Sequence, residues 1–328
     1  GRWIAWAQLG EGGEWTLVVT DIAGNRRSES PLAGRPDYLA FEDWIPDPAD
    51  SAVEPAIGPR IYALVGTPTG FGMVSLDPIN GLPDFEVARG APLFFDQAPN
   101  SPLVVVQVND RTAVVDASSP GGAVTEVGRG RVTSVLPVWN PVDANEVLFA
   151  ESNDDTAGGV LRRRDLAAGT SSPVLAYAAG IQLDPSPNGD RLAVVVGPTF
   201  GGVDDPFNDP DVVSVGFETS DSEENPAQLP TLAEAGLWAV DATTGAAEQM
   251  TARRSTIAQW DPTSTWAVVL HANGPQSPTW AAYGPAGVVV ETPPIAINTA
   301  AAGNYLAFWD QSDPTFVSAG STAFFSPT

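Results

Sequence analysis

A unit recurs along the chain at intervals of about 45 residues, and it begins with a Trp/Phe-x-Pro-type bend followed by a short apolar run. A second apolar run follows each of the first and ends in Asp and a turn. Three copies show the pattern best: LDPSPNGDRLAVVVG at 183–197, VWNPVDANEVLFAES at 138–152 and QWDPTSTWAVVLHAN at 259–273. Runs of this length bounded by turn residues predict β-strands.

The strand that follows each bend gives a marker for counting the repeats. Successive markers are 58, 42, 44, 45, 75 and 38 residues apart, and they begin near Trp3, Ile61, Leu103, Val147, Leu192, Ala267 and Tyr305. Partner strands are predicted over 15–25, 73–81, 112–122, 160–170 and 237–246, several of them ending in an Asp-x-x-x-Gly hairpin signal. Further short strands are predicted at 123–127 and 246–250.

Four short strands in about 45 residues make the blade of a β-propeller, so the sequence predicts an all-β protein built from four-stranded blades. Helical periodicity is nearly absent, and the one candidate for a short helix is PTLAEAG at 230–236. We expect a single domain over 1–328, with acidic, Pro-rich insertions at 41–59 and 198–235 that break the spacing.

These repeats resemble the TolB-like, WD-repeat-like family of β-propellers. Blades of that family carry W-S-P-D-G-x-x-I-A-F followed by L-Y-V-x-D-x-x-T-G, and this chain has PSPNGDRLAVV at 185–195 and LWAVDATTG at 237–245. The resemblance covers essentially the whole chain. It implies the fold and leaves the activity open, because the family includes periplasmic adaptors, peptidase accessory domains and surface proteins.

The two ends of the chain complement each other. The last residues read FFSPT and the first read GRWIAW, and joined together they make one complete bend and strand. We therefore expect the C-terminal strand to join the N-terminal blade and close the ring, which removes exposed sheet edges. Seven blades are favoured, with six as the alternative because the segment 294–320 is short for a full blade.

The net charge of the chain disfavours two classes of partner, nucleic acids and anionic lipid surfaces. The chain has 15 Lys plus Arg, all of them Arg, against 40 Asp plus Glu, which gives a formal net charge of −25. Such a charge opposes binding to nucleic acid and to anionic lipid surfaces, since both depend on basic residues. We expect no nucleic-acid partner.

Composition also suggests a compartment. The chain has no Cys, which excludes disulfides and thiolate chemistry, and no apolar run approaches the roughly 18 residues of a spanning helix. The Cys-free, Lys-free and Gly-, Pro- and Trp-rich composition is more typical of an envelope or secreted protein, so we expect a periplasmic, cell-surface or secreted location. No signal peptide precedes the first motif, and the start of this chain is compatible with removal of one.

The second insertion contains the main candidate for a metal site. Calcium prefers six to eight oxygen ligands, and five carboxylate and amide side chains crowd one loop: Asp204, Asp205, Asn208, Asp209 and Asp211. Their spacing does not match an EF-hand, and a solvated acidic loop is the favoured alternative. A weaker cluster, Asn153 to Asp155, lies in a predicted hairpin where turn preference alone explains it. No cofactor is required by any motif.

The sequence contains few residues or motifs that are typical of catalytic sites. His271 is the only histidine, and at the end of a predicted strand a structural, hydrogen-bonded role is favoured for it over catalysis. No G-x-S-x-G, H-E-x-x-H or Gly-rich phosphate loop is present. Peptidases of the TolB-like kind keep their nucleophile in a separate α/β domain, which nothing here matches. We predict no catalytic residue.

Aromatic and basic residues have ordinary structural explanations. Trp139 and Trp260 in the bends, together with Phe95 and Trp44, are expected to pack between adjacent blades. The run Arg162 to Arg164 is expected to form ion pairs with nearby carboxylates, the alternative being a docking spot for an acidic partner.

The function that these features favour is protein–protein interaction by a non-enzymatic extracytoplasmic propeller, or a subunit role in a larger envelope or surface assembly. The ring face and the two insertions would supply the contacts. The alternative is a calcium-dependent, lactonase-like hydrolase or small-ligand binder at the central channel, whose ligands would come from scattered strand ends.

Overall fold

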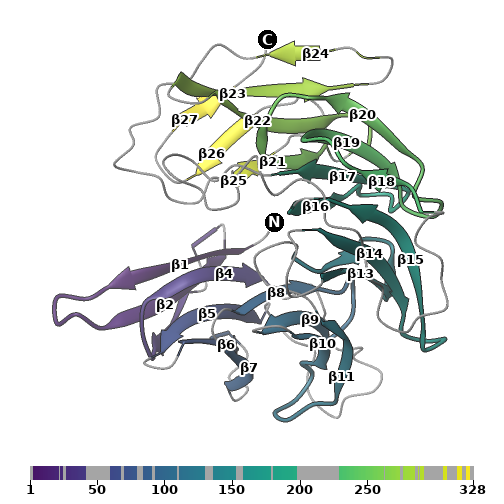
Figure 1. Ribbon diagram of the computed structural model, residues 1–328. Coiled ribbons are helices and arrows are strands. Elements are labelled where there is room, and N and C mark those ends of the chain that lie inside the picture. Colours follow the sequence, from purple (N-terminus) through teal and green to yellow (C-terminus); the bar gives the residue numbers. More distant parts are fainter. Residues whose placement is uncertain are drawn as a thin grey trace. The chain divides into compact units, whose positions relative to one another are not determined.

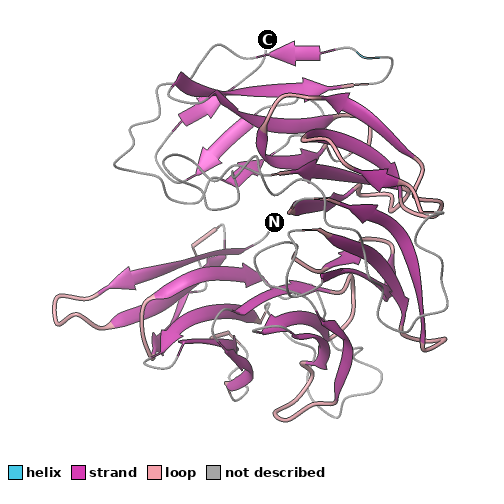
Figure 2. Ribbon diagram, viewed as in Figure 1, coloured by secondary structure: helices cyan, strands magenta, loops and turns pink. Residues whose placement is uncertain are grey.

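A computed structural model gives the fold of the protein (Figures 1 and 2), and every element of regular structure described in it is a β-strand. The described residues are 3–21, 23–24, 27–41, 60–67, 70–79, 84–90, 93–108, 111–129, 136–152, 158–178, 180–197, 229–261, 263–273, 276–284, 287, 289–291, 306–308, 316–319 and 323–325. They form seven sheets, which we label A to G in chain order.

The chain divides into two compact units, the first made of Gly1–Val132 and Leu136–Val147 and the second of Thr133–Val135 and Leu148–Thr328. Sheets A, B and C belong to the first unit. In order across each sheet, their strands are β1 (Trp3–Leu9), β2 (Trp15–Asp21) and β3 (Arg27–Leu32) in sheet A; β4 (Pro36–Phe41), β5 (Ile61–Thr67), β6 (Gly70–Leu76) and β7 (Phe85–Gly90) in sheet B; β8 (Leu93–Gln97), β9 (Leu103–Val108), β10 (Arg111–Asp116) and β11 (Val124–Arg129) in sheet C.

Sheet D contains the division between the units, which falls within β13, and sheets E, F and G belong to the second unit. Their strands, again in spatial order, are β12 (Val138–Asn140), β13 (Asp143–Ser152), β14 (Gly159–Asp165), β15 (Thr170–Tyr177) and β18 (Thr231–Leu232) in sheet D; β16 (Ile181–Pro185), β17 (Arg191–Val196), β19 (Gly236–Asp241) and β20 (Ala247–Thr251) in sheet E; β21 (Ser255–Trp260), β22 (Ala267–Asn273), β23 (Gln276–Tyr283) and β24 (Val289–Glu291) in sheet F; β25 (Leu306–Phe308), β26 (Phe316–Ala319) and β27 (Ala323–Phe325) in sheet G.

The strands predicted from the bends are confirmed. Each marker begins a strand or lies within one or two residues of its start, apart from Val147, which lies inside the long β13. In sheets B to F the marker strand is second in its sheet, and the strand before the bend is first. Sheets A and G begin with the marker strand itself, and only three strands are described in each.

The described core lies between neighbouring sheets, and five marker strands, β5, β9, β13, β17 and β22, bury side chains on both of their faces. In β17 all residues after Arg191 are buried, and Val104, Val105 and Val106 in β9 are likewise buried. Strands covered on both faces read as continuous apolar runs rather than as alternating ones. Separate clusters of buried side chains join sheets A and B, sheets B and C, and sheets E and F.

The Asp-Gly hairpin ends also form as predicted. The Asp165 carboxylate accepts a hydrogen bond from the Ala168 backbone N–H, and the Asp241 carboxylate accepts from those of Thr243 and Thr244. The turn after β19 then closes through Gly245, whose φ is +71°. These side chains replace backbone acceptors in the turn, which is why Asp recurs at this position.

The helix predicted at 230–236 is wrong. Thr231–Leu232 forms β18, which pairs in parallel with β15 at the edge of sheet D. The Pro230 carbonyl accepts from the Ala176 N–H at 2.9 Å, and the Leu232 carbonyl accepts from the Ala178 N–H at 3.1 Å. The open backbone groups of β15 therefore outweigh the weak helical preference of the local sequence.

The predicted ring closure by the C-terminal strand stays a prediction. In the described residues β27 pairs with β26 in antiparallel register, from Phe316–Phe325 to Ser318–Ala323. β1 pairs with β2 and stands first in sheet A. Most of both insertions, 42–59 and 198–228, lies outside the described residues.

Candidate functional site

The predicted metal ligands fall where the structure describes nothing. Asp204, Asp205, Asn208, Asp209 and Asp211 all lie outside the described residues, as do Asn153 to Asp155 and Trp44. Within the described part of the chain, no group of three or more His, Cys, Asp or Glu side chains is arranged to hold a metal ion. The calcium site is therefore untested. Nor do the described residues include a helix long and apolar enough to cross a membrane.

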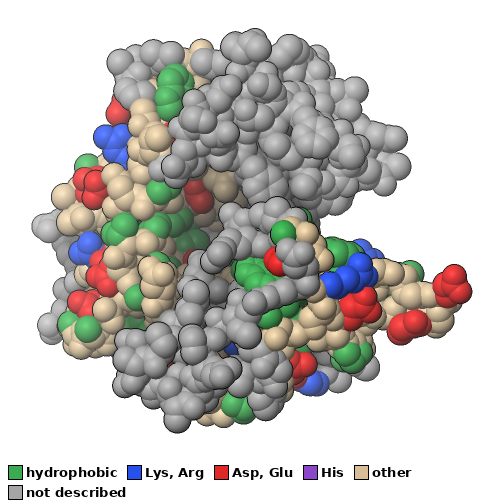
Figure 3. All heavy atoms as spheres, turned by 180° about the vertical axis from the view of Figure 1, so that it is seen from behind, with side chains coloured by type: hydrophobic (Ala, Val, Ile, Leu, Met, Phe, Trp, Pro, Cys, Tyr) green, Lys and Arg blue, Asp and Glu red, His purple; other side chains and the backbone are tan. Residues whose placement is uncertain are grey.

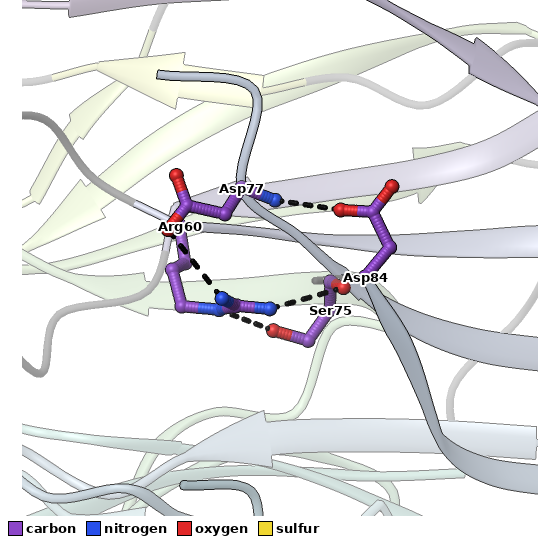
Figure 4. A network of polar contacts seen from close by, with 4 residues as sticks. All are labelled: Arg60, Ser75, Asp77 and Asp84. Atoms are coloured by element: carbon purple, nitrogen blue, oxygen red, sulfur yellow. Dashed lines mark hydrogen bonds and ion pairs between the residues drawn. The ribbon is translucent and has the colours of Figure 1, made fainter. Parts of the chain in front are cut away.

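The polar network around Arg60 lies at one end of sheet B (Figure 4). Arg60 Nε donates to Ser75 Oγ at 2.8 Å, Nη2 donates to the Ser75 carbonyl at 3.2 Å, and Nη1 lies 3.4 Å from Asp77 Oδ2. The Asp77 N–H in turn donates to Asp84 Oδ1 at 3.0 Å, and the guanidinium stacks over the Phe85 ring at 5.1 Å. One cation thus ties together the start of β5, the end of β6 and the start of β7.

This network is buried and its main groups are paired. The Asp77 side chain has no exposed surface, and that of Arg60 is 12% exposed. A guanidinium that is already held by a carboxylate, a hydroxyl and a carbonyl has little capacity for an outside anion. We conclude that the Arg60 network stabilises sheet B.

His271 lies at the centre of a second buried network, in sheet F. Its Nδ1 lies 3.1 Å from Ser255 Oγ and its Nε2 lies 2.7 Å from the Tyr283 hydroxyl, with both His271 and Ser255 fully buried. Because Ser255 Oγ donates its one hydrogen to the Arg253 carbonyl, it accepts a hydrogen bond from His271 Nδ1–H. Nε2 then accepts from the Tyr283 hydroxyl.

That tautomer is the wrong one for activating Ser255. A general base must accept the nucleophile's proton, whereas Nδ1 here donates to the serine. The buried position also keeps substrate from both groups. The geometry therefore agrees with the structural role predicted for His271.

The basic run in β14 forms the kind of contact expected of it. Arg162 Nε donates to the Glu151 carboxylate on the neighbouring strand β13. This ion pair supports the explanation by local salt bridges, although the docking alternative for the run as a whole is untested.

The two bend tryptophans do more than fill space, and sequence reasoning missed this. The Trp139 backbone N–H donates to Asp96 Oδ2 at 2.9 Å, and the Trp260 N–H donates to Asp184 Oδ2 at 2.6 Å. In each case the Asp lies on the first strand of one sheet, β8 or β16, and the Trp on another first strand, β12 or β21. The shared F-D-Q-A-P-N and L-D-P-S-P-N bends at 95–100 and 183–188 were the available signal.

Exposed aromatic side chains distinguish the first strands of sheets B and C. Tyr38 and Phe41 on β4 are 47% and 37% exposed, and Phe94 on β8 is 37% exposed; we refer to these three as the exposed aromatic set. The two strands lie together, since Gln97 Nε2 donates to the Phe41 carbonyl at 2.7 Å and the Tyr38 and Phe95 rings meet edge to face at 5.6 Å.

Hydrophobic side chains are visible at the surface of this unit, inward from the acidic tip of hairpin β1–β2 (Figure 3). On β1 itself, Ile4 and Leu9 are about half exposed. By contrast, the apolar residues of β16 in the second unit are buried, with Ile181 at 2% and Leu183 at 7%. Exposed aromatic residues are over-represented where proteins bind one another.

The surroundings of Asp261 and Tyr38 shift the pKa values of these two side chains. Burial raises the pKa of Asp261, but hydrogen bonds from Thr263, Trp266 and Thr265 outweigh it and hold the pKa below its usual value. Burial, and then the charge of Asp96, raise the pKa of Tyr38, so this phenol stays protonated at neutral pH.

No family model matches the chain, and no curated protein matches it significantly. Solved structures do resemble it. The β-propeller domain of Cps50 (Swd1) from Myceliophteria thermophila aligns with a TM-score of 0.56 and 13% identity over 100% of this chain and 94% of that one. The β-propeller domain of the Trilobed protease from Pyrococcus furiosus, described as having an open velcro topology, aligns at 0.51 and 12% identity over 91% and 83%.

A mutant puromycin hydrolase complexed with PGG aligns with a TM-score of 0.55 and 17% identity over 98% of this chain. This chain spans about half the length of that hydrolase, 49%. At such low identities the likeness shows the fold alone. The chain therefore has a β-propeller fold, as its repeats predict.

Proposed function

We propose that this protein is a non-enzymatic β-propeller that binds another protein, either as a recognition module or as a subunit of a larger envelope or surface assembly. The observation that carries the proposal is the exposed aromatic set on β4 and β8. Large aromatic side chains left exposed on a rigid scaffold are the usual anchors of protein interfaces. The only histidine, His271, is buried and its Nδ1 donates to Ser255, which supports a role without catalysis.

We assign the contact surface to the exposed aromatic set and the two insertions, 41–59 and 198–235. The first insertion begins at Phe41, so it continues directly from one member of the set. The formal net charge of −25 opposes nucleic acid as the partner and favours a protein with basic surface.

We further propose a ring of seven blades, of the TolB-like kind, located in the periplasm, at the cell surface or outside the cell. The count rests on the seven described sheets, and the family assignment on the motifs at 185–195 and 237–245. Closure would come from the C-terminal strand, since FFSPT supplies the bend that the first marker strand lacks. The location rests on composition.

The test begins with gentle purification from the native envelope or culture fraction, followed by mass spectrometry of any protein present in stoichiometric amount. Binding of that partner is then measured with Tyr38→Ser, Phe41→Ser and Phe94→Ser combined, and separately with 198–228 replaced by a short Gly-Ser linker. The matched control is Val124→Ser with Val142→Ser, since both valines are more exposed than the aromatic set. Loss of at least tenfold in affinity, with the control unchanged, is expected.

Repeating the purification with a chelator addresses calcium. A protein that emerges alone, carries calcium and loses thermal stability on chelation would contradict the proposal and favour the channel-site alternative. Unchanged partner binding in the aromatic variant would remove this surface from the proposal.

A further inference from the structure

Two buried polar atoms between sheets E and F have no hydrogen-bond partner among the residues that the structure describes. Trp260 is 4% exposed, and its indole Nε1–H is unpaired within the described part of the chain; the same holds for Gln182 Oε1. One atom is a donor and the other an acceptor. Buried polar groups in native proteins are satisfied by protein or by ordered water, so each requires a partner.

Strand register places both groups in the same layer. Gln182 is paired with Val195 across β16 and β17, and partners directly across a ladder point to the same face. Val195 belongs to the apolar cluster that joins sheets E and F, and so does Trp260. The Gln182 side chain therefore points toward the sheet that carries the indole.

A backbone contact fixes the distance between the two strands. Asp184, two residues from Gln182 and thus on the same face of β16, accepts a hydrogen bond from the Trp260 N–H at 2.6 Å. Gln182, whose amide oxygen is unpaired among the described residues, lies two residues before Asp184 on this face of β16.

The corresponding tryptophan in the first unit shows what a satisfied indole looks like. The Trp139 backbone N–H is held by Asp96 in the same way, but its indole Nε1–H also donates to the Asp96 carbonyl, at 3.0 Å. The two sites share the backbone contact and differ in whether the indole N–H is bonded to protein, and two residues before the Asp one has Phe94 where the other has Gln182.

We propose that an ordered water molecule binds between β16 and β21, accepting a hydrogen bond from Trp260 Nε1 and donating one to Gln182 Oε1. Water is both donor and acceptor, and a buried water commonly has two to four polar partners. Apart from the Tyr283 hydroxyl, which is bonded to His271, the other members of the buried cluster that contains Trp260 are apolar, so a ligand larger than water has little to recognise here.

The experiment uses the full chain, deuterated and labelled with ¹⁵N, and measures magnetisation transfer from water to the tryptophan indole protons by paired NOESY and ROESY spectra. A long-lived water gives the Trp260 Nε1–H a cross-peak of opposite sign in the two spectra, whereas chemical exchange gives the same sign. The Trp139 Nε1–H, which donates to Asp96, is the internal control and is expected to show no such peak.

Trp260→Phe and Trp139→Phe assign the two indole signals; if either fails to fold, contacts of the Trp260 indole with Ala193 and Val195 assign it in the wild type. Gln182→Met removes the acceptor and keeps the volume, and is expected to abolish or strongly weaken the Trp260 cross-peak. Absence of a dipolar peak in the wild type overturns the proposal. A peak that persists unchanged in Gln182→Met overturns the bridge.

Discussion

Sheets B and E place the same pair of charges at the same position and use it differently. In sheet E, Arg191 stands opposite Asp241 in the ladder, and both side chains are exposed. In sheet B, Arg60 and Asp77 stand one step beyond the Ile61–Leu76 pair, and both are largely buried. The Asp241 carboxylate accepts hydrogen bonds from its own turn, whereas the Asp77 carboxylate is paired with Arg60.

The difference shows that burial, rather than pairing, decides what an ion pair contributes. An exposed pair is screened by water and contributes little, while removal of one partner from a buried pair leaves an uncompensated charge. The same residues in the same repeat position therefore range from near neutral to structurally essential.

Arg60→Ala should have the largest effect on the free energy of unfolding. It leaves the Asp77 carboxylate buried without its cation, which costs about 3–5 kcal/mol. Urea unfolding measures the change. Arg191→Ala is the matched control at the equivalent exposed pair and is expected to change stability by no more than about 1 kcal/mol. Equal losses in the two variants would contradict the role assigned to burial.

Gly245→Ala should come second, through the turn that Asp241 supports. An added Cβ would lie 2.1 Å from the Val174 carbonyl oxygen, at a φ of +71°, so strain and overlap together cost about 2–4 kcal/mol. Gly169 occupies the same turn position in sheet D with φ +68° and open space around it. Gly169→Ala is therefore expected to cost only about 1–2 kcal/mol, and thermal unfolding of both proteins would separate strain from overlap.

Asp261→Asn tests an intermediate case. The Asp261 carboxylate is buried, as that of Asp77 is, but it accepts hydrogen bonds from its own turn, as that of Asp241 does. One of its oxygens accepts from the Thr265 and Trp266 N–H groups, so weakening this acceptor should cost about 1–3 kcal/mol. Because the folded pKa lies below the unfolded value of about 3.9, this contribution is present above that value and is lost as pH falls through the folded pKa. The difference between wild type and variant should therefore shrink in acid; a constant difference from pH 7 to pH 2 would argue against it.

Asp241→Ala should have the smallest effect, at most about 1 kcal/mol, because water replaces most of what the exposed carboxylate provides. Hydrogen bonds from Thr244 lower its pKa, so the small contribution is also expected to disappear at acid pH. Equilibrium unfolding at pH 7 and pH 2 measures it, because the contribution is lost only as pH falls through the folded pKa. Asp165→Ala in sheet D is the parallel turn variant at pH 7. A loss as large as that of Arg60→Ala would show that the exposed turn matters more than its surroundings indicate.

Local signals predicted most of the fold. Apolar runs and bends are properties of a few consecutive residues, so the marker strands and the Asp-Gly turns could be found from sequence. β18 could not, because its partner β15 lies more than 50 residues earlier and supplies hydrogen bonds that local preference does not record.

The candidate site was harder to predict for the same reason. The Arg60 network joins side chains on different strands, and no periodicity marks it. The Asp–Trp contacts join different sheets, and their only sequence signal is the bend shared by 95–100 and 183–188. The exposed aromatic set looks like core from its sequence, since Tyr38 and Phe94 each stand next to an apolar residue in a strand. The predicted metal ligands remain untested.

The docking of Thr231–Leu232 onto β15 has a consequence for how this chain tolerates change. Two backbone hydrogen bonds set the register just before β19, so differences in length or composition upstream of Leu229 need not be transmitted to sheet E. The docking of β18 thus fixes the register at which the chain continues into β19. New binding sequences could be grafted upstream of Leu229 while the repeat that follows keeps its alignment.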